Sequence, residues 1–177
     1  MQTDRQDAPS WPDEIFATFK NHDVRQVAYV PDAGHARLIE LCHGEPGMRA
    51  VVLTTEEEGV ALLAGAWLGG ERGALLMQSS GVGNCVNMLA LIEECRFPLL
   101  VLVTMRGVWG EFNPWQVPMG RGTPAALENA GVMVKPVEDA AHVAETVNAA
   151  ARLAYSTSRA VAVLIGQRVI GYKNWSR

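Results

Sequence analysis

Short apolar runs alternate along the chain with segments in which apolar residues recur at helical spacing. The runs are rich in Val, Leu, Ile and Ala, and turn-forming residues separate them from the helical segments, which is typical of strands. We expect strands at residues 26–30, 50–54, 74–78, 99–104, 132–134 and 160–165. We expect helices at residues 12–22, 35–42, 57–68, 83–95, 124–129 and 139–155.

This alternation predicts the fold class. Crossover helices must cover both faces of a parallel sheet, and residues 98–104 form an apolar run that suits a strand buried on both faces. The sequence therefore predicts an α/β fold, a doubly wound three-layer domain with a mostly parallel sheet. Because ligands bind where the strands of such a sheet end, residues just after the strands are the first candidates for a site.

The composition limits the kinds of binding partner and the cellular compartment that we expect. The chain has 177 residues, 49% of them hydrophobic, and a net charge of −4. This size fits one domain at residues 11–177 after a flexible lead-in at residues 1–10. Charges of both signs are scattered, which gives no reason to expect nucleic acid or a membrane as a partner. The cysteines and histidines lack metal-ligand spacing, and no signal peptide is visible, so we expect a cytoplasmic chain without a metal site of its own.

Three consecutive carboxylates, Glu56, Glu57 and Glu58, begin the helix predicted after the second strand. Acidic residues favour the first turn of a helix by about 0.3–1 kcal/mol each, so a solvated acidic turn explains them without chemistry. The helix continues with small residues such as Ala61 and Ala64, which allow a bulky group to approach its backbone. Helical spacing alone does not decide which carboxylate points inward.

Residues 78–84, Gln-Ser-Ser-Gly-Val-Gly-Asn, lie between an apolar strand and a predicted helix. Glycines there allow tight turning, and exposed amides can receive an anion, although an ordinary strand-to-helix turn has the same composition. The segment also matches two glycines of a dinucleotide-binding fingerprint. With Arg106 after the next strand to accept a phosphate, an NADP-binding domain is one alternative.

Residues 104–123 lack clear periodicity and combine aromatic residues, two arginines and turn formers. A stretch of this length without a periodic pattern is often functional. Exposed aromatic residues beside arginine are typical of protein interfaces, whereas convergent arginine and glutamine side chains suit an anionic substrate. Both uses are compatible in one segment.

Together these segments resemble the pyrimidine-binding domain of thiamine-diphosphate decarboxylases, most closely the sulfopyruvate and phosphonopyruvate decarboxylases. Residues 56–67 look like the family's activating-glutamate motif, whose glutamate lies ten positions before an aromatic residue, and counting back from Trp67 selects Glu57. Residues 77–84 resemble the family's Met-Gln-Asn-Ser-Gly-Leu-Gly-Asn, with Ser79 replacing the asparagine. Residues 106–121 match a third signature, and the resemblance extends over roughly residues 24–165.

The resemblance implies an activity, cofactors and a partner. Family members use thiamine diphosphate and Mg²⁺ to decarboxylate 2-oxo acids to aldehydes and CO₂. Their Gly-Asp-Gly segment, which binds magnesium and the diphosphate, does not occur in this sequence. The resemblance therefore implies a separate beta-type subunit that holds the Mg²⁺ and the diphosphate, in a hetero-oligomer such as α₂β₂. The chain is then active only together with this partner.

The resemblance also implies roles for single residues. The catalytic residue is Glu57, which hydrogen-bonds a pyrimidine nitrogen of the cofactor and so activates it. The expected cofactor contacts are Glu57, Gln78, Ser80, Gly81 and Asn84. The expected contacts to the anionic substrate are His35, Gln116 and Arg121. His35 has an alternative role as a helix cap, and Arg106 has one as the partner of a nearby acidic residue.

Two further alternatives stay open beside the NADP-binding domain. The first is a decarboxylase for phosphonopyruvate or another 2-oxo acid, because the motifs identify the family and not the substrate. The second is a non-catalytic binding or regulatory module with the same fold, which the departure at Ser79 suggests.

Overall fold

The computed structural model describes residues 10–171, so almost all of the predicted lead-in and the last residues of the predicted domain lie outside it. The fold is a six-stranded sheet in the order β2-β1-β3-β4-β6-β5, in which every recorded pairing is parallel. Its strands are β1 (Val24–Tyr29), β2 (Arg49–Val52), β3 (Arg72–Gln78), β4 (Leu99–Thr104), β5 (Met133–Val137) and β6 (Ala160–Ile165). The predicted α/β class is confirmed.

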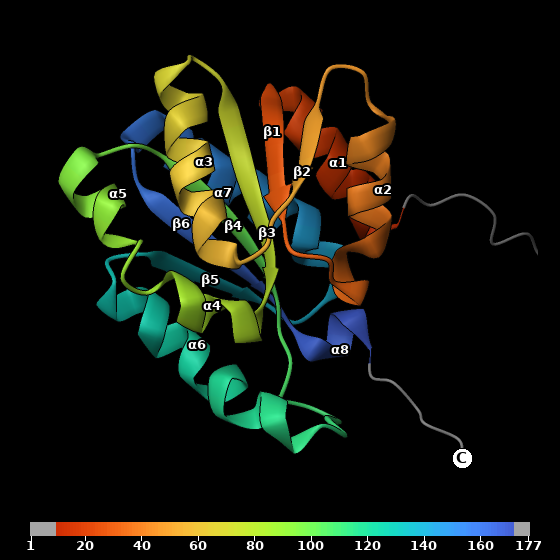
Figure 1. Cartoon of the computed structure of the whole chain (residues 1–177). Coiled ribbons are helices and arrows are strands. Elements are labelled where there is room, and N and C mark those ends of the chain that lie inside the picture. The colour runs from red at the N-terminus through yellow and green to blue at the C-terminus, as the bar shows by residue number, and fades with distance from the viewer. Residues whose placement is uncertain (1–9, 172–177) are drawn as a thin grey trace, which may run out of the picture.

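Helices connect the strands and cover both faces of the sheet (Figure 1). The α-helices are α1 (Trp11–Asn21), α2 (Ala36–Gly44), α3 (Glu56–Leu68), α4 (Ser79–Cys85), α5 (Ala90–Cys95), α6 (Val117–Asn129), α7 (Val143–Thr157) and α8 (Gln167–Ile170). Short 3₁₀ turns precede three of them: η1 (Ala33–His35), η2 (Pro114–Gln116) and η3 (Ala140–His142). None of the described helices is long and apolar enough to span a bilayer.

The core has two parts, one on each face of the sheet. Side chains from α1, α2 and α7 pack on one face, around Phe19, Leu38 and Val147. Side chains from α3, α4, α5 and α6 pack on the other, around Val60, Val82 and Leu127. These are the three layers that the alternation of strands and helices predicts.

The central strands agree best with the sequence analysis. β4 and β6 have the predicted bounds, and every residue in both strands is buried. A strand covered on both faces must be apolar at consecutive positions, and such a run is easy to recognise in a sequence.

Three helical segments differ from the prediction. The helix expected at residues 83–95 is two helices, α4 and α5, separated by a turn at residues 86–89 that contains Asn87, a poor helix former. α6 begins at Val117 instead of residue 124, since Pro118 suits its first turn and the glycines that follow allow close packing. The short helix α8 was not predicted.

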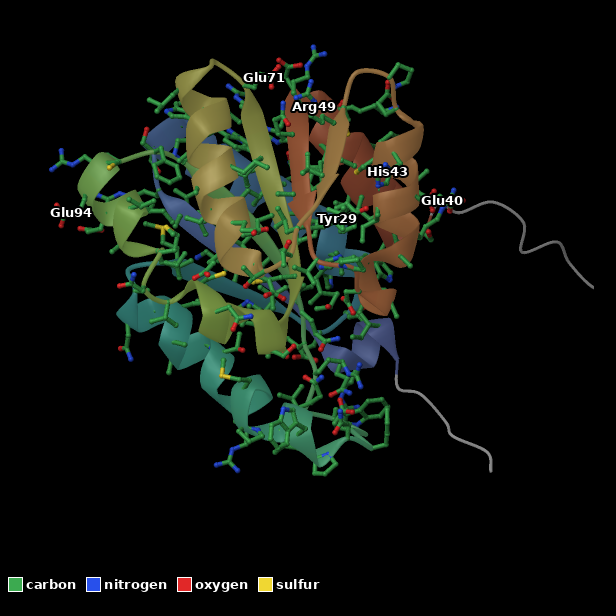
Figure 2. The ribbon with its side chains drawn as sticks, in the orientation of Figure 1. Tyr29, Glu40, His43, Arg49, Glu71 and Glu94 are labelled. Atoms are coloured by element: carbon green, nitrogen blue, oxygen red, sulfur yellow. The ribbon has the colours of Figure 1, made fainter. Side chains whose placement is uncertain are left out.

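All carboxyl ends of the strands lie at the same edge of the sheet. In Figure 2, Arg49 and Glu71, which lie at or next to the starts of β2 and β3, mark the opposite edge. The direction in which strands are added to the sheet changes between the neighbours β1 and β3, because β2 lies on the outer side of β1 whereas β4 lies on the other side of β3. The crevice beyond such a reversal is the usual ligand site of a doubly wound sheet.

Candidate active site

The carboxyl ends of β1 and β3 are joined through side chains. Gln78, the last residue of β3, donates its Nε2 hydrogen to Oδ1 of Asp32 at 3.1 Å. Thr104, at the end of β4, donates its hydroxyl to the other carboxylate oxygen of Asp32. Ser80 in turn donates its hydroxyl to Oε1 of Gln78 at 3.0 Å. Asp32, Gln78, Ser80 and Thr104 therefore form a connected polar cluster at the carboxyl ends of the strands.

The three glutamates at the start of α3 have different surroundings. Glu56 is buried, with 8% of its surface exposed, and its Oε2 accepts a hydrogen bond of 2.8 Å from Nδ2 of Asn84. Glu58 is exposed and accepts a hydrogen bond of 2.8 Å from the backbone amide of Thr54. Glu57 is half-buried, and no hydrogen bond or ion pair of its carboxylate is recorded within residues 10–171.

The different surroundings of the three glutamates bear on which of them serves the chain's own structure, a question that helical spacing left open. Two of the three carboxylates serve the chain's own structure, Glu56 by joining α3 to α4 and Glu58 by capping its own helix. Glu57 is the one of the three carboxylates for which no partner is recorded within residues 10–171. Its role in the cofactor site stays a prediction, and so do the roles of the other candidate residues.

Gly81 lies against the buried carboxylate. A Cβ atom added at Gly81 would overlap the side chain of Glu56, so only glycine lets α4 approach α3 this closely at that point. The predicted cofactor residues Gln78, Ser80, Gly81 and Asn84 therefore lie on one short stretch beside the start of α3.

The segment after β4 is fixed by a buried ion pair. Arg106 donates from Nε and Nη2 to the two carboxylate oxygens of Glu111 at 2.8 and 2.7 Å. Glu111 also accepts hydrogen bonds from the backbone amides of Gly107 and Asn113 and from the side chain of Gln167. The Arg106 guanidinium, together with these amides, lowers the pKa of Glu111 to about 2.

This ion pair decides between two interpretations of Arg106. Its guanidinium is engaged with an acidic residue, as the alternative role for Arg106 predicted. The NADP-binding alternative needs an available arginine at this position, and Glu111 removes it. The structure therefore gives that alternative no support.

Two of the three predicted substrate residues have buried atoms without a partner. Oε1 of Gln116 and Nδ1 of His35 are the only buried side-chain nitrogen or oxygen atoms within residues 10–171 that form no hydrogen bond. Such atoms are rare in folded proteins and need an explanation. Gln116 as a whole is half-buried and lies immediately before α6, but its amide oxygen is buried, so its role as a substrate contact stays a prediction.

His35 is placed differently. Its ring is fully buried, and Nε2 lies 3.2 Å from the carbonyl oxygen of Leu102 in β4. Burial is the main cause that lowers the pKa of His35. The side chain caps no helix, because the N-cap position of α2 shows no side-chain hydrogen bond. As a substrate contact His35 stays a prediction, and its enclosed position disfavours it.

Arg121 and the aromatic residues of the third segment lie on the surface. Arg121 is exposed on α6. Trp115 is 87% exposed, whereas the Trp109 ring lies 4.9 Å from the guanidinium carbon of Arg168 and the Phe112 ring lies 5.8 Å from that of Arg106. This segment therefore presents aromatic and cationic groups beside the carboxyl edge.

The sequence analysis missed several residues of this edge. Asp32, Thr104, Glu111 and Gln167 have no individual role in the predictions from sequence. Several of their hydrogen bonds join distant parts of the sequence, 72 residues apart for Thr104 and Asp32 and 56 for Gln167 and Glu111. Their common signal is a polar residue immediately after a predicted strand or within an aperiodic loop.

The cofactor that the resemblance implies can be tested against these residues. A pyrimidine needs a carboxylate free to hydrogen-bond a ring nitrogen and a nearby surface without bulky side chains. Glu57 has no recorded hydrogen-bond partner within residues 10–171, and Gly83 is an exposed residue without a side chain on α4, so the residues present are compatible with these needs. Within the described residues no group of three or more His, Cys, Asp or Glu side chains is arranged to hold a metal ion.

Comparison with known proteins identifies the family of this chain. The model of the thiamine pyrophosphate enzyme N-terminal TPP binding domain matches residues 12–113. The chain belongs to this family. The relatives include sulfopyruvate decarboxylase subunit alpha of Methanothermobacter thermautotrophicus, which is 35% identical over 152 residues, covering 85% of this chain and 92% of the relative.

One further relative and one solved structure are longer than this chain. Phosphonopyruvate decarboxylase of Streptomyces viridochromogenes is 37% identical over 141 residues, covering 78% of this chain but 36% of the relative. A solved 2-oxoglutarate:ferredoxin oxidoreductase from Magnetococcus marinus has a TM-score of 0.71 at 14% identity. That match covers 92% of this chain and 29% of the solved chain, and it confirms the fold.

Proposed function

We propose that this chain is the pyrimidine-binding subunit of a two-subunit, thiamine-diphosphate-dependent decarboxylase of a small anionic 2-oxo acid, with sulfopyruvate as the first candidate. The products are the corresponding aldehyde and CO₂. The chain's similarity to an alpha subunit over 92% of that subunit's length supports this division of the enzyme. The cysteines form no disulfide among the described residues and Cys95 is exposed, which supports a reducing compartment such as the cytoplasm.

The observation that carries the proposal is the condition of Glu57. It is a half-buried carboxylate for which no partner is recorded within residues 10–171, near a glycine-rich segment at the edge where a doubly wound sheet binds its ligands. Its two neighbours already have hydrogen-bond partners. A partly desolvated and unpaired carboxylate is costly, so a molecule that pairs with it stabilises the site.

The surface next to Glu57 supports the need for a second subunit. After its three glutamates, α3 consists only of apolar residues and glycine. Its outer side, with Ala61 and Gly65, is exposed, and Leu68 is 87% exposed. A helix that is apolar on all sides is normally buried, and small residues allow a partner to approach closely. We assign this face to the subunit that holds the diphosphate and Mg²⁺.

Most of the predicted residues have a task in this proposal. Glu57 would hold a proton between its carboxylate and a pyrimidine nitrogen, and Gln78, Ser80 and Asn84 would contact the ring. When bound, thiamine diphosphate supplies the electron sink for decarboxylation. The amide of Gln116 and the guanidinium of Arg121 orient the acidic groups of the substrate. The partner subunit and this chain together exclude water.

Purification of the native complex tests the proposal. We expect mass analysis to find a companion chain with a Gly-Asp-Gly segment, together with thiamine diphosphate and Mg²⁺. The complex should release CO₂ from sulfopyruvate, and assays with phosphonopyruvate and pyruvate will identify the preferred acid. A complex that binds NADP but no thiamine diphosphate would contradict the proposal.

Substitution of Glu57 tests the carboxylate itself. Glu57→Gln and Glu57→Ala should remove most turnover while the complex still assembles, because only the group that bonds the pyrimidine is lost. Full activity of either variant in the purified complex excludes the assigned role. An assembled wild-type complex without turnover of any 2-oxo acid would instead favour the binding or regulatory module.

A further inference from the structure

Gln167, the first residue of α8, is a polar residue that is almost completely buried, although its helix has only four residues. Only 1% of its surface is exposed. A buried amide group is costly unless its oxygen and its nitrogen both form hydrogen bonds. The partners of Gln167 therefore account for its burial.

Those partners lie in residues 107–113, here named the aromatic loop, which follow β4 at the carboxyl edge beside α8 (Figure 1). Oε1 of Gln167 accepts hydrogen bonds from the backbone amides of Val108 and Trp109, at 3.1 and 2.9 Å. Its Nε2 donates a hydrogen bond of 2.9 Å to Oε2 of Glu111. One side chain of α8 thus holds the aromatic loop at three points.

Glu111 completes this arrangement from inside the aromatic loop. Its carboxylate accepts hydrogen bonds from the backbone amides of Gly107 and Asn113 and forms the ion pair with Arg106. Four backbone amides of the loop therefore bond to two side chains, Glu111 and Gln167, which also bond to each other. Because no residue of the loop belongs to a helix or strand, these bonds replace those that regular secondary structure would supply.

α8 is itself attached to the sheet. The amide of Gly166, the residue before α8, donates a hydrogen bond of 2.8 Å to the carbonyl oxygen of Val137 at the end of β5. A Cβ atom added at Gly166 would overlap the carboxylate of Glu138, so the chain passes close to the residue that follows β5. Since β6 leads directly into Gly166, two neighbouring strands fix the position of Gln167.

The first residue of the aromatic loop contacts the predicted substrate residue Gln116. Gly107 has a φ of +77°, in the left-handed region that favours glycine. A Cβ atom added there would overlap the backbone carbonyl of Gln116. The backbone of Gly107 therefore packs against that of Gln116, and the next residue, Val108, is bonded to Gln167. A displacement of Val108 would shift Gln116 as well.

We propose that Gln167 is a positioning residue for the substrate side of the site, which holds the aromatic loop so that Gln116 keeps its place at the carboxyl edge. This inference rests on the proposed function, because that proposal assigns Gln116 to the anionic substrate. Within residues 10–171, the recorded bonds of Gln167 reach no residue of the 78–84 segment assigned to the cofactor. Loss of these bonds should weaken substrate binding and leave cofactor binding unchanged.

Kinetics of the reconstituted complex, with its companion subunit, thiamine diphosphate and Mg²⁺, test this separation. Gln167→Met keeps an unbranched side chain of similar size but removes the three hydrogen bonds. It should raise KM for the preferred 2-oxo acid about fivefold. kcat and the Kd of thiamine diphosphate should change by less than about twofold. A general loss of structure would instead weaken the binding of cofactor and substrate together.

A double-substitution cycle tests whether Gln167 acts through Gln116. Gln116→Ala removes the amide group and should raise KM about tenfold. The double variant should also lie about tenfold above wild type and not about fiftyfold, because displacing an amide that is already absent has no further effect. Effects that multiply would show that Gln167 acts on another group and would overturn the inference.

Gln26→Met is the matched control. Gln26 also donates its Nε2 hydrogen to Oε2 of a glutamate, Glu71, but it lies near the start of β1 at the opposite edge of the sheet. Its KM should stay within about twofold of wild type. An increase as large as that of Gln167→Met would show that the effect does not depend on the aromatic loop.

Hydrogen exchange measures the contact without relying on turnover. The backbone amides of Val108 and Trp109 should exchange slowly in the wild-type complex, and Gln167→Met should accelerate their exchange about tenfold or more. Rapid exchange of both amides in the wild type overturns the inference, even where Gln167→Met fails to fold.

The outcomes separate this inference from the proposed function. A wild-type complex that neither binds thiamine diphosphate nor turns over a 2-oxo acid overturns the proposed function, and this inference with it. A complex that turns over overturns this inference alone in two cases. In the first, Gln167→Met leaves KM unchanged, and in the second it weakens cofactor binding as much as substrate binding.

Discussion

Glu111 and Arg106 form a two-point ion pair, with nitrogen–oxygen distances of 2.8 and 2.7 Å, beneath the aromatic segment that follows β4. The Glu111 side chain is only 3% exposed and that of Arg106 is 15% exposed. Two-point pairs of this kind are strong and fix geometry as well as charge. The ion pair therefore holds the loop that carries Trp109 and Phe112 in one arrangement.

This ion pair gives stability a specific dependence on pH. The pKa of Glu111 is about 2 in the folded chain, below its usual value near 4.5, so its stabilising contribution is present above about pH 4.5 and is lost as the pH falls toward 2. At pH 7, Glu111→Gln should lower the free energy of unfolding by an amount on the order of 2 kcal/mol. Urea unfolding from pH 7 to pH 3 should show the difference from wild type shrinking as the pH falls.

The exposed Glu128 on α6 provides the control for this measurement. Glu128→Gln should change the unfolding free energy by less than about 0.5 kcal/mol at every pH, because no partner of its side chain is recorded. A constant difference between wild type and Glu111→Gln from pH 7 to pH 3 would contradict the assigned pKa.

Two glycines in α6 should respond in opposite ways to alanine. A Cβ atom at Gly120 would overlap the backbone carbonyl of Arg106, whereas nothing lies within 4 Å of a Cβ atom at Gly122. Gly120→Ala should therefore lower the free energy of unfolding by about 1–3 kcal/mol. Gly122→Ala should raise it by up to about 1 kcal/mol, since alanine favours a helix. Thermal unfolding of both variants checks this, and equal effects would exclude the close contact.

The buried His35 should make the fold sensitive to mild acid. Its pKa is lowered by burial, so between its folded and unfolded pKa values the unfolded chain binds the extra proton. Stability should therefore fall as the pH drops below about 6.5, the usual histidine value. His35→Asn should flatten this part of the pH profile in urea unfolding between pH 7.5 and 5. A variant that keeps the wild-type slope would show that other groups cause the loss.

Gly65 tests whether a partner covers α3. No atom lies within 4 Å of a Cβ atom at Gly65, so Gly65→Leu should not disturb the fold of the chain. The new side chain should nevertheless reduce assembly with the companion subunit, measured by size-exclusion chromatography. Gly44→Ala, at the end of α2 on the other face of the sheet, also has open space and should assemble normally. Normal assembly of Gly65→Leu would place the interface elsewhere.

The sequence predicts the fold well because its strongest signals are local. The consecutive apolar residues of β4 and β6 identify buried parallel strands with their observed bounds. The start of α6, in contrast, depends on a contact with another element and not on local sequence signals. Gly120 weakens the helix in isolation but is required by the carbonyl of Arg106, which lies on a different element. At Gly120 the contact with Arg106 therefore outweighs the low helix propensity of glycine.

The surroundings of the candidate site residues likewise could not be predicted from local sequence patterns. The motif count selects Glu57, but spacing could not show that Glu56 and Glu58 bond to Asn84 and to the Thr54 amide. Asp32 has no distinguishing motif, since its partners Gln78 and Thr104 join it only after the strands have paired. Local patterns thus identify candidates, whereas pairing between distant elements decides their surroundings.

The apolar outer side of α3 also bears on how cells must produce this protein. Newly made copies without a companion present Leu68 and its small neighbours to chaperones, proteases and one another. Balanced synthesis of the two chains would keep such orphan copies scarce. Overproduction of this chain alone should instead give aggregates or rapid degradation, which co-expression relieves.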